Sequence, residues 1–149
     1  MRQMTNREKL GLLGEILVAS MLGAERSEDK YDSDKDMILP DGTEIEVKTQ
    51  NRHPNGTFTI NSKHQSNFLK CMSVDRLIFV EYNLTDYIHI YECTERPRYR
   101  SFTTHPTARD PNGRSMIGWP IDRMKLLRQI NNAELSSEMR RLSAAKGFK

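Results

Sequence analysis

The sequence predicts an α+β protein in which helices flank a mixed central β-sheet. Three observations support this fold class. Apolar residues recur at helical spacing near the start of the chain, over about residues 6–22. Several later runs alternate between apolar and polar residues, as half-buried strands do. A short helical segment divides these runs into two groups, and this order of elements fits a sheet covered by helices.

The length and composition fit a single folded domain. The chain has 149 residues, of which 36% are hydrophobic and 29% charged, which describes a polar globular protein rather than a disordered one. We expect one domain over residues 1–149, with a core over about 5–93, an arginine-rich loop over about 94–119 and C-terminal helices over about 120–147.

The first element should be a helix over about residues 6–22. Its apolar side chains recur every three or four residues, and Gly23 provides a stop signal. The helix is apolar nearly all round, as buried helices are. Glu15 lies on a ridge with Gly11 and Ala19, and these small residues would let the helix approach the sheet closely.

A β-hairpin is expected after an acidic loop. Residues 36–39 form its first strand, residues 40–42 supply Pro-Asp-Gly turn chemistry, and residues 44–50 alternate as its second strand. The alternation gives the second strand one polar face, made of Glu44, Glu46, Lys48 and Gln50.

The rest of the chain predicts a strand, a short helix and a strand pair, then a long loop containing a short strand, and finally two helices. The strand spans about 57–60, the short helix 63–72, and the strand pair 75–82 and 86–93. The loop spans about 94–119 with its strand at 99–102, the first of the two helices spans 120–130, and the second ends near 147. His89 alternates with Tyr87 and Tyr91 on the strand over 86–93, which we interpret as a structural face.

Charge is distributed unevenly along the sequence. Residues 25–36 hold six acids and three bases, whereas residues 96–114 hold five arginines and one aspartate, and residues 121–149 hold seven bases and three acids. This asymmetry indicates an anionic partner for the second half of the chain and a cation for the first. The alternative is that these are solvated surface charges without a partner.

The cysteine content and hydropathy suggest a cytoplasmic protein. Cys71 and Cys93 are too few for a disulfide framework, which favours a reducing compartment. The longest uncharged apolar run, residues 16–24, is too short to cross a bilayer, and no signal peptide is evident. We therefore expect no membrane association.

The hairpin brings together residues that suit metal-dependent chemistry. Pairing across the turn places Asp36 opposite Glu46 or Val47, and cross-strand neighbours lie about 5 Å apart. Two carboxylates and a backbone carbonyl are ligands that Mg²⁺ accepts, while the ion keeps several waters. Lys48 beside such an ion can orient or deprotonate a water, or stabilise charge on a phosphate.

Glu15 is a candidate fourth member of this site. A glutamate on a buried helix is costly unless something pairs with it, and Lys48 or a metal-bound water is the expected partner. The alternative is that Glu15 lies on a solvated seam between Gly11 and Ala19.

Glu15, then Asp36, nine further residues and Glu46-Val47-Lys48 resemble the signature of the PD-(D/E)XK nuclease superfamily, whose fold is restriction-endonuclease-like. The resemblance spans roughly half the chain, from Glu15 to about Tyr91. One departure is Lys35, which stands where the signature has proline. The nearby Pro-Asp pair at residues 40–41 is what a tight turn requires, so we do not assign it to the site.

The resemblance implies a Mg²⁺-dependent endodeoxyribonuclease, with Mn²⁺ able to substitute, of the restriction, phage, homing or junction-resolvase type. It also implies metal ligation by Asp36, Glu46 and the Val47 carbonyl, and placement of the attacking water by Lys48, with Glu15 as the helix glutamate. The expected substrate is duplex or branched DNA, and the expected assembly is a homodimer or a higher homo-oligomer.

The DNA surface is expected in the arginine-rich loop and beside the hairpin. Arginine forks suit phosphates and guanine edges, and the interleaved Tyr99 and Phe102 suit stacking or groove insertion. The candidate DNA-binding residues are Gln50, Lys63, His64, Gln65, Arg96, Arg98, Arg100, Arg109 and Arg114. Two alternatives stay open: a catalytically inactive DNA-binding protein on the same fold, and an RNA-directed nuclease.

Overall fold

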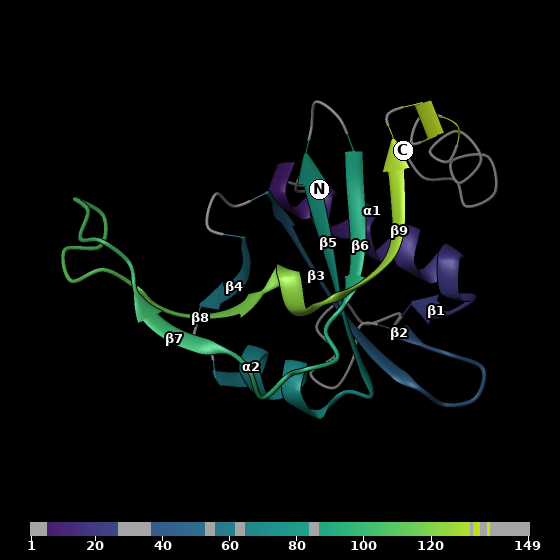
Figure 1. Cartoon of the computed structure of the whole chain (residues 1–149), viewed down its shortest axis with the longest axis horizontal. Helices are drawn as coiled ribbons and strands as arrows, with labels where there is room; N and C mark the ends of the chain where they lie inside the picture. The colour runs from purple at the N-terminus through teal and green to yellow at the C-terminus, as the bar shows by residue number, and fades with distance from the viewer. Residues whose placement is uncertain are drawn as a thin grey trace, which may run out of the picture.

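Among the residues that it describes, the computed structural model of the chain shows two β-sheets and two α-helices (Figure 1). The structure describes residues 6–26, 37–52, 56–61, 65–83, 87–131, 133–134 and 137. A six-stranded sheet forms the body, and a three-stranded sheet lies beside it. The predicted α+β class, with a mixed sheet flanked by helices, is confirmed.

The large sheet has the strand order β1-β2-β3-β5-β6-β9. The central pair, β3 and β5, is parallel, and the other neighbours are antiparallel. The strands are β1 (Glu25–Arg26), β2 (Met37–Ile38), β3 (Glu44–Asn51), β5 (Arg76–Asn83), β6 (Tyr87–Glu92) and β9 (Lys125–Asn131).

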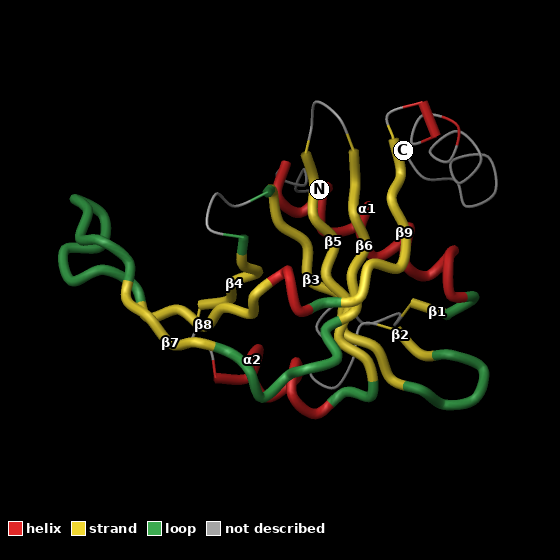
Figure 2. Tube along the Cα trace, viewed as in Figure 1, coloured by secondary structure: helices red, strands yellow, loops and turns green. Residues whose placement is uncertain are grey.

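The small sheet is antiparallel and has the order β4-β8-β7. Its strands are β4 (Thr57–Asn61), β8 (Ser115–Pro120) and β7 (Arg100–Thr103), and the helix α2 (Gln65–Ser73) follows β4 in the chain. We call residues 100–120 the arm: β7, β8 and their connecting loop extend away from the body (Figure 2).

Helix α1 (Asn6–Leu22) has the predicted bounds and runs behind the large sheet (Figure 1). Its close approach to the sheet occurs at Gly14, where an added Cβ would lie 2.2 Å from the Thr49 hydroxyl oxygen. The expected ridge of Gly11, Glu15 and Ala19 is therefore not the contact line, since a Cβ on Gly11 would meet open space. Gly23 ends the helix at a φ of 69°, as the sequence indicates.

The hairpin turn has the geometry that its sequence predicts. Leu39 donates its N–H to the Thr43 carbonyl at 2.9 Å, and Gly42 has a φ of 91°. The Asp41 carboxylate accepts hydrogen bonds from the Thr43 hydroxyl at 2.6 Å and from the Thr43 N–H at 2.9 Å. These bonds, led by the hydroxyl, lower the pKa of Asp41. Asp41 thus has a structural role at the tip of the hairpin.

The two faces of the large sheet carry separate hydrophobic cores. Along β5, Ile78 and Val80 pack into the core beneath α1, whereas Leu77 and Phe79 belong to the core on the opposite face. That second core also receives Trp119 from β8 and the Phe58 ring of β4, which stacks on Phe79 with ring centroids 4.4 Å apart. The small sheet therefore covers the large sheet on the face away from α1.

The expected helix over 120–130 is wrong. Residues 121–123 form one 3-10 turn (η1, Ile121–Arg123), and β9 follows, pairing along β6 with Ile130 opposite Ile88. Leucines and isoleucine at 126, 127 and 130 fit helical spacing, but pairing with the sheet edge decides the conformation. The expected helix ending near residue 147 lies almost wholly outside the described residues.

The loop expected over 94–119 contains two strands rather than one. The short strand predicted at 99–102 corresponds to β7, but β8 was not predicted because Gly118 and Pro120 signal a turn. In β8 the glycine has a packing role, since a Cβ on Gly118 would lie 3.2 Å from the Phe102 ring. Neither described helix has the length and hydropathy needed to span a bilayer.

Candidate active site

A fully buried carboxylate between two ammonium groups lies on β3. Glu46 has no exposed surface, and its Oε2 lies 3.0 Å from Lys48 Nζ while its Oε1 lies 3.2 Å from Lys70 Nζ. The lysine side chains keep 27% and 12% of their surface exposed, so the cluster opens to solvent on its lysine side. We call these three residues the Glu46 cluster; its formal charge is +1.

Strand alternation and the helix α2 together build this cluster. Glu46 and Lys48 are two residues apart on β3, so they point to the same face, and the parallel register places them beside Leu77 and Phe79 of β5. Lys70 reaches the cluster from α2, on the same face. Burying one carboxylate costs several kcal/mol unless it is paired, and the two ammonium groups provide that compensation.

The structure separates the predicted catalytic residues into two groups. Glu46 and Lys48 are in contact, as the hairpin pattern predicts. Asp36 lies outside the described residues; its neighbour Met37 is opposite Ile45, the residue before Glu46. Glu15 is half-buried on α1, which covers the other face of the sheet from the Glu46 cluster.

Two of the three predicted metal ligands, Glu46 and Val47, lie within the described residues. The Glu46 carboxylate and the Val47 carbonyl are hard oxygen donors of the kind that Mg²⁺ accepts. Within the described ranges, no three His, Cys, Asp or Glu side chains are grouped closely enough to hold a metal ion. Asp36, the third predicted ligand, lies outside the described residues, and a divalent ion at Glu46 would compete with the two lysines for its carboxylate.

Lys70 is a cluster residue that the sequence did not indicate. It lies 24 positions after Glu46 (70 minus 46), on a different element, and no spacing rule connects a helix lysine to a strand glutamate. The one available signal was indirect. Glu46 lies on a strand face that is buried in the structure, and a buried glutamate requires a cationic partner from another element.

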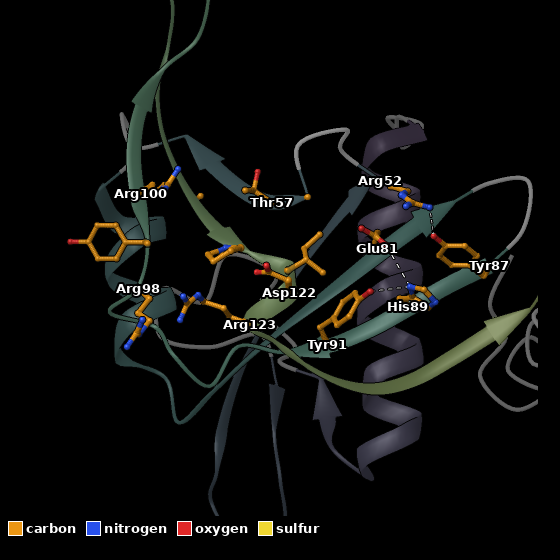
Figure 3. A pocket seen from close by; sticks show the side chains of 15 residues that line it. Arg52, Thr57, Glu81, Tyr87, His89, Tyr91, Arg98, Arg100, Asp122 and Arg123 are labelled. Carbon is orange, nitrogen blue, oxygen red and sulfur yellow. Dashed lines mark hydrogen bonds and ion pairs between the residues drawn. The ribbon is translucent and has the colours of Figure 1, made fainter.

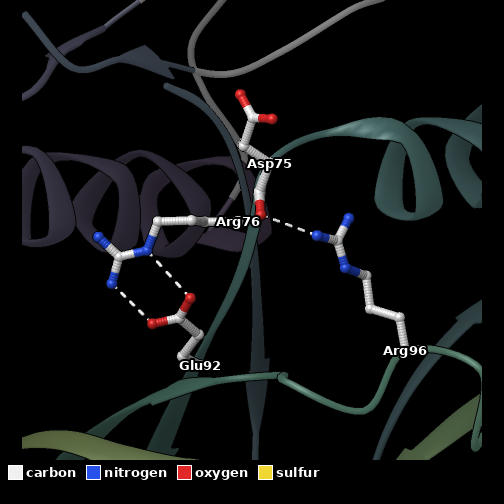
Figure 4. A network of polar contacts seen from close by, with 4 residues as sticks. All are labelled: Asp75, Arg76, Glu92 and Arg96. Carbon is white, nitrogen blue, oxygen red and sulfur yellow. Dashed lines mark hydrogen bonds and ion pairs between the residues drawn. The ribbon is translucent and has the colours of Figure 1, made fainter. Parts of the chain in front are cut away.

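Two predicted DNA-binding residues instead hold the fold together. The Gln50 amide donates to the Thr57 carbonyl at 2.6 Å and accepts from the Thr59 N–H at 3.0 Å, which fastens β4 to β3. The Arg96 guanidinium donates to the Asp75 carbonyl at 2.8 Å (Figure 4) and to carbonyls at the end of α2, those of Cys71, Met72 and Val74.

Arg76 and Glu92 form a further structural pair near this point. Two hydrogen bonds, at 2.6 and 3.0 Å, join the Arg76 guanidinium to the Glu92 carboxylate across β5 and β6 (Figure 4). The hydrogen bond to Glu92 raises the pKa of Arg76. This part of the surface is therefore occupied by the protein's own contacts.

The remaining predicted arginines are exposed on the arm or, for Arg98, just before it. Arg98 and Arg114 make ion pairs of 3.5 Å with Glu95 and Asp110, and both arginine side chains are more than half exposed. Arg100 and Arg109 are also exposed. Lys63 and His64 lie outside the described residues, and so does the side chain of Gln65, where α2 begins.

The arm loop is held in shape by its own hydrogen bonds. Thr104 donates its N–H to the Arg114 carbonyl at 2.9 Å, and its hydroxyl accepts from the Arg114 N–H at 2.7 Å. Gly113, with a φ of 73°, donates to the Asp110 carbonyl at 2.9 Å. Two aromatic rings, Tyr99 and Phe102, remain 38% and 37% exposed where the arm leaves the body.

A cavity of about 810 Å³ lies between the arm and the β5–β6 pair (Figure 3). We call it the β6 cavity. Its floor includes Glu81, which is 4% exposed, and His89, whose Nδ1 lies 3.5 Å from Glu81 Oε1. The Tyr91 hydroxyl is 3.0 Å from the same Nδ1, and burial is the main cause that raises the pKa of Tyr91. The structural face predicted for β6 is thus a polar network.

Comparison of the sequence with models of known protein families finds no match, and comparison with curated proteins finds none either.

Proposed function

We propose that this chain is a Mg²⁺-dependent endodeoxyribonuclease that hydrolyses DNA phosphodiester bonds at the Glu46 cluster. The observation that supports it best is the contact of Lys48 with the fully buried carboxylate of Glu46, two residues away on β3. A fully buried carboxylate in the first half of a central strand is costly to maintain. A catalytic site that needs a metal ligand and a lysine at fixed positions would explain why this free-energy cost is tolerated.

The roles of the residues follow from their contacts. Glu46, with Asp36 and the Val47 carbonyl, would hold the ion, which supplies charge stabilisation to the phosphate and lowers the pKa of a bound water. Lys48, the more exposed lysine, orients that water or stabilises charge on the phosphate oxygens. Lys70 holds the other oxygen of Glu46 and fixes the carboxylate's orientation. The reaction adds water across one P–O bond and leaves a phosphomonoester and a hydroxyl.

The arm supports nucleic acid as the substrate. It carries Arg100, Arg109 and Arg114 on exposed positions, together with the exposed ring of Phe102. Cationic side chains on a projecting β-ribbon suit contacts with phosphates, and an aromatic side chain suits insertion into a groove. Arg96 and Gln50 are excluded from this surface because their polar groups bind the protein backbone.

A catalytically inactive DNA-binding protein is the second candidate. One observation favours it: within the described ranges no group of three metal-ligating side chains is present. In that case the Glu46 cluster would be a structural ion pair network and the arm would be the functional part.

Cleavage assays test the proposal directly. Wild type should cut supercoiled or branched DNA with Mg²⁺ and not with EDTA; linear duplex, single-stranded DNA and RNA define the substrate class. Asp36→Asn and Glu46→Gln should abolish cleavage, and the control Glu44→Gln, on the same strand, should retain it. Folding of each variant is checked by circular dichroism. Wild-type rates in both variants, or no cleavage of any substrate by wild type, would contradict the proposal.

A further inference from the structure

The floor of the β6 cavity is a rigid aromatic surface. The rings of Tyr87 and His89 are stacked, with centroids 3.9 Å apart and an angle of 25° between planes, and Tyr91 meets His89 edge-on. Both ring nitrogens of His89 have partners, since Nε2 lies 3.0 Å from Gln129 Oε1 and Nδ1 lies 3.0 Å from the Tyr91 hydroxyl. These contacts fix the stack, so little side-chain entropy is lost when a ligand packs against it.

The rim of the cavity is cationic. Four arginines line it, against the carboxylates of Glu81 and Asp122, which gives the lining a formal excess of two positive charges when His89 is neutral. The arginines are Arg52, Arg98, Arg100 and Arg123. Arg52 donates to the Tyr87 hydroxyl at 2.6 Å, which places a guanidinium at the edge of the aromatic stack (Figure 3). Flat rings beside guanidinium groups are the combination that binds a base and its phosphate.

The cavity is separate from the Glu46 cluster, although both lie on the same face of the sheet. Gln50, four residues after Glu46 on β3, is opposite Glu81, which in turn is opposite His89. Four residues along a strand and two strands across give a separation of roughly 16 Å between Glu46 and His89. The stacked rings of Phe58 and Phe79 fill the core on this face of the sheet.

The shape of the site excludes a paired base. A base within a duplex offers only its edge in a groove, so a concave site of this size is reached by a nucleotide that has left the stack. The buried Glu81 carboxylate can accept a hydrogen bond from an exocyclic amine of such a base, and the rim arginines suit its phosphate.

We propose that the β6 cavity binds one unpaired nucleotide of the DNA substrate, with its base against the Tyr87–His89 stack and its phosphate at Arg52. This inference rests on the proposed function in that DNA is the substrate, and it names the class within it: DNA with an unpaired nucleotide, as at a bulge, flap or branch. The cavity thereby selects substrates by structure rather than by sequence.

Equilibrium binding in EDTA tests the cavity independently of cleavage. Three labelled DNAs are compared by fluorescence anisotropy: a perfect duplex, the same duplex with one unpaired thymidine or adenosine, and the same bulge carrying an abasic sugar phosphate. A stacked base should tighten binding by about 5- to 150-fold. Wild type should therefore prefer the bulge with a base over both the duplex and the abasic bulge.

Four variants assign that preference to the cavity. Tyr87→Leu should remove the preference for the base, whereas Tyr87→Phe should keep it because the ring remains. Arg52→Gln should weaken binding of the two bulged DNAs equally, since it acts on the phosphate. Lys125→Gln is the charge-matched control, because Lys125 is exposed on β9 and does not line the cavity.

The outcomes separate this inference from the nuclease proposal. Equal affinity of wild type for all three DNAs, or an unchanged preference in Tyr87→Leu, overturns the cavity assignment even if the protein cuts DNA. A preference that Tyr87→Leu removes supports the assignment even if no Mg²⁺-dependent cleavage is found. If Tyr87→Leu does not fold, Arg52→Gln decides: the same affinity as wild type for both bulged DNAs overturns the proposal.

Discussion

Glu46 and Glu81 are two buried glutamates on the same face of the same sheet, but their partners differ. Glu46 contacts two ammonium groups, whereas Glu81 contacts an imidazole that is charged only when protonated. Two ammonium groups compensate the charge of a fully buried carboxylate, and a carboxylate is a group that suits a metal ligand. The surroundings of Glu81 instead provide an imidazole and a tyrosine hydroxyl that form hydrogen bonds, which suits recognition of a base.

Replacing each of these two glutamates by glutamine should affect stability very differently, and the larger loss is expected at Glu46. Glu46→Gln removes the negative charge and leaves two lysines at a buried position, so it should lower the free energy of unfolding by about 3–5 kcal/mol. Urea denaturation followed by circular dichroism measures the change, with Glu44→Gln as the control. A loss no larger than that of Glu44→Gln would show that the cluster is well solvated.

Lys48 should dominate the chemistry. Lys48→Ala should lower the single-turnover cleavage rate by about 10²- to 10⁴-fold, the usual contribution of a positioned proton-transfer group. Lys48→Arg should restore little, because a planar, permanently charged fork does not replace a compact ammonium. Rapid-quench kinetics gives the rates; near-normal turnover in Lys48→Arg would exclude proton transfer by Lys48.

Replacing Lys70 tests whether its charge strengthens or weakens the binding of Mg²⁺. Its ammonium lies 3.2 Å from a carboxylate oxygen and would repel a divalent ion, so Lys70→Gln should tighten Mg²⁺ binding, by about tenfold for a repulsion of about 1.4 kcal/mol. Isothermal titration calorimetry measures the affinity. Weaker binding would mean that the orientation which Lys70 gives the Glu46 carboxylate matters more to the ion than this repulsion.

The arm arginines should act through salt dependence. Replacing both Arg109 and Arg114 by glutamine should flatten the slope of log K against log salt by about two units, since each neutralised phosphate contributes about 0.9. The measurement is a salt titration of duplex binding in EDTA, with Lys125→Gln as the control. An unchanged slope would move the phosphate contacts away from the arm.

The smallest effect is expected at Glu81. Glu81→Gln keeps a hydrogen-bonding side chain beside His89, so it should lower the free energy of unfolding by about 1 kcal/mol, the size of one hydrogen bond. Urea denaturation alongside Glu46→Gln gives the direct comparison. Equal losses at the two positions would remove the distinction between an ionic and a neutral site.

The local pattern of the first half of the chain was sufficient to predict most of its elements, although β1 (Glu25–Arg26) lies in what was expected to be an acidic loop. Alternation over residues 44–50 and the turn at Pro40–Gly42 gave the hairpin, and helical spacing gave α1 with its bounds. These features depend on residues close together in sequence. The contact between Glu46 and Lys48 followed from the same alternation.

Contacts between distant parts of the chain explain what the sequence did not predict. Lys70 joins Glu46 only because α2 packs over β3, and the roles of Arg96 and Gln50 depend on carbonyls supplied by other elements. The apolar spacing of residues 126–130 fits a helix, but in the structure these residues form a strand because they pair with β6. The polar network of the β6 cavity likewise requires β5, β6 and β9 side by side.

The parallel pairing of β3 with β5 also affects how the chain is made. Ile45 pairs with Arg76, 31 residues later (76 minus 45), so β3 is synthesised before its partner strand β5. At about 5–20 residues per second, that interval is about 2–6 s. During this time the backbone N–H and C=O groups along the β5 edge of β3 lack the partners that they have in the folded sheet. An unpaired strand edge is a template for pairing with another chain, so residues 44–51 are exposed to wrong pairing until β5 has been made.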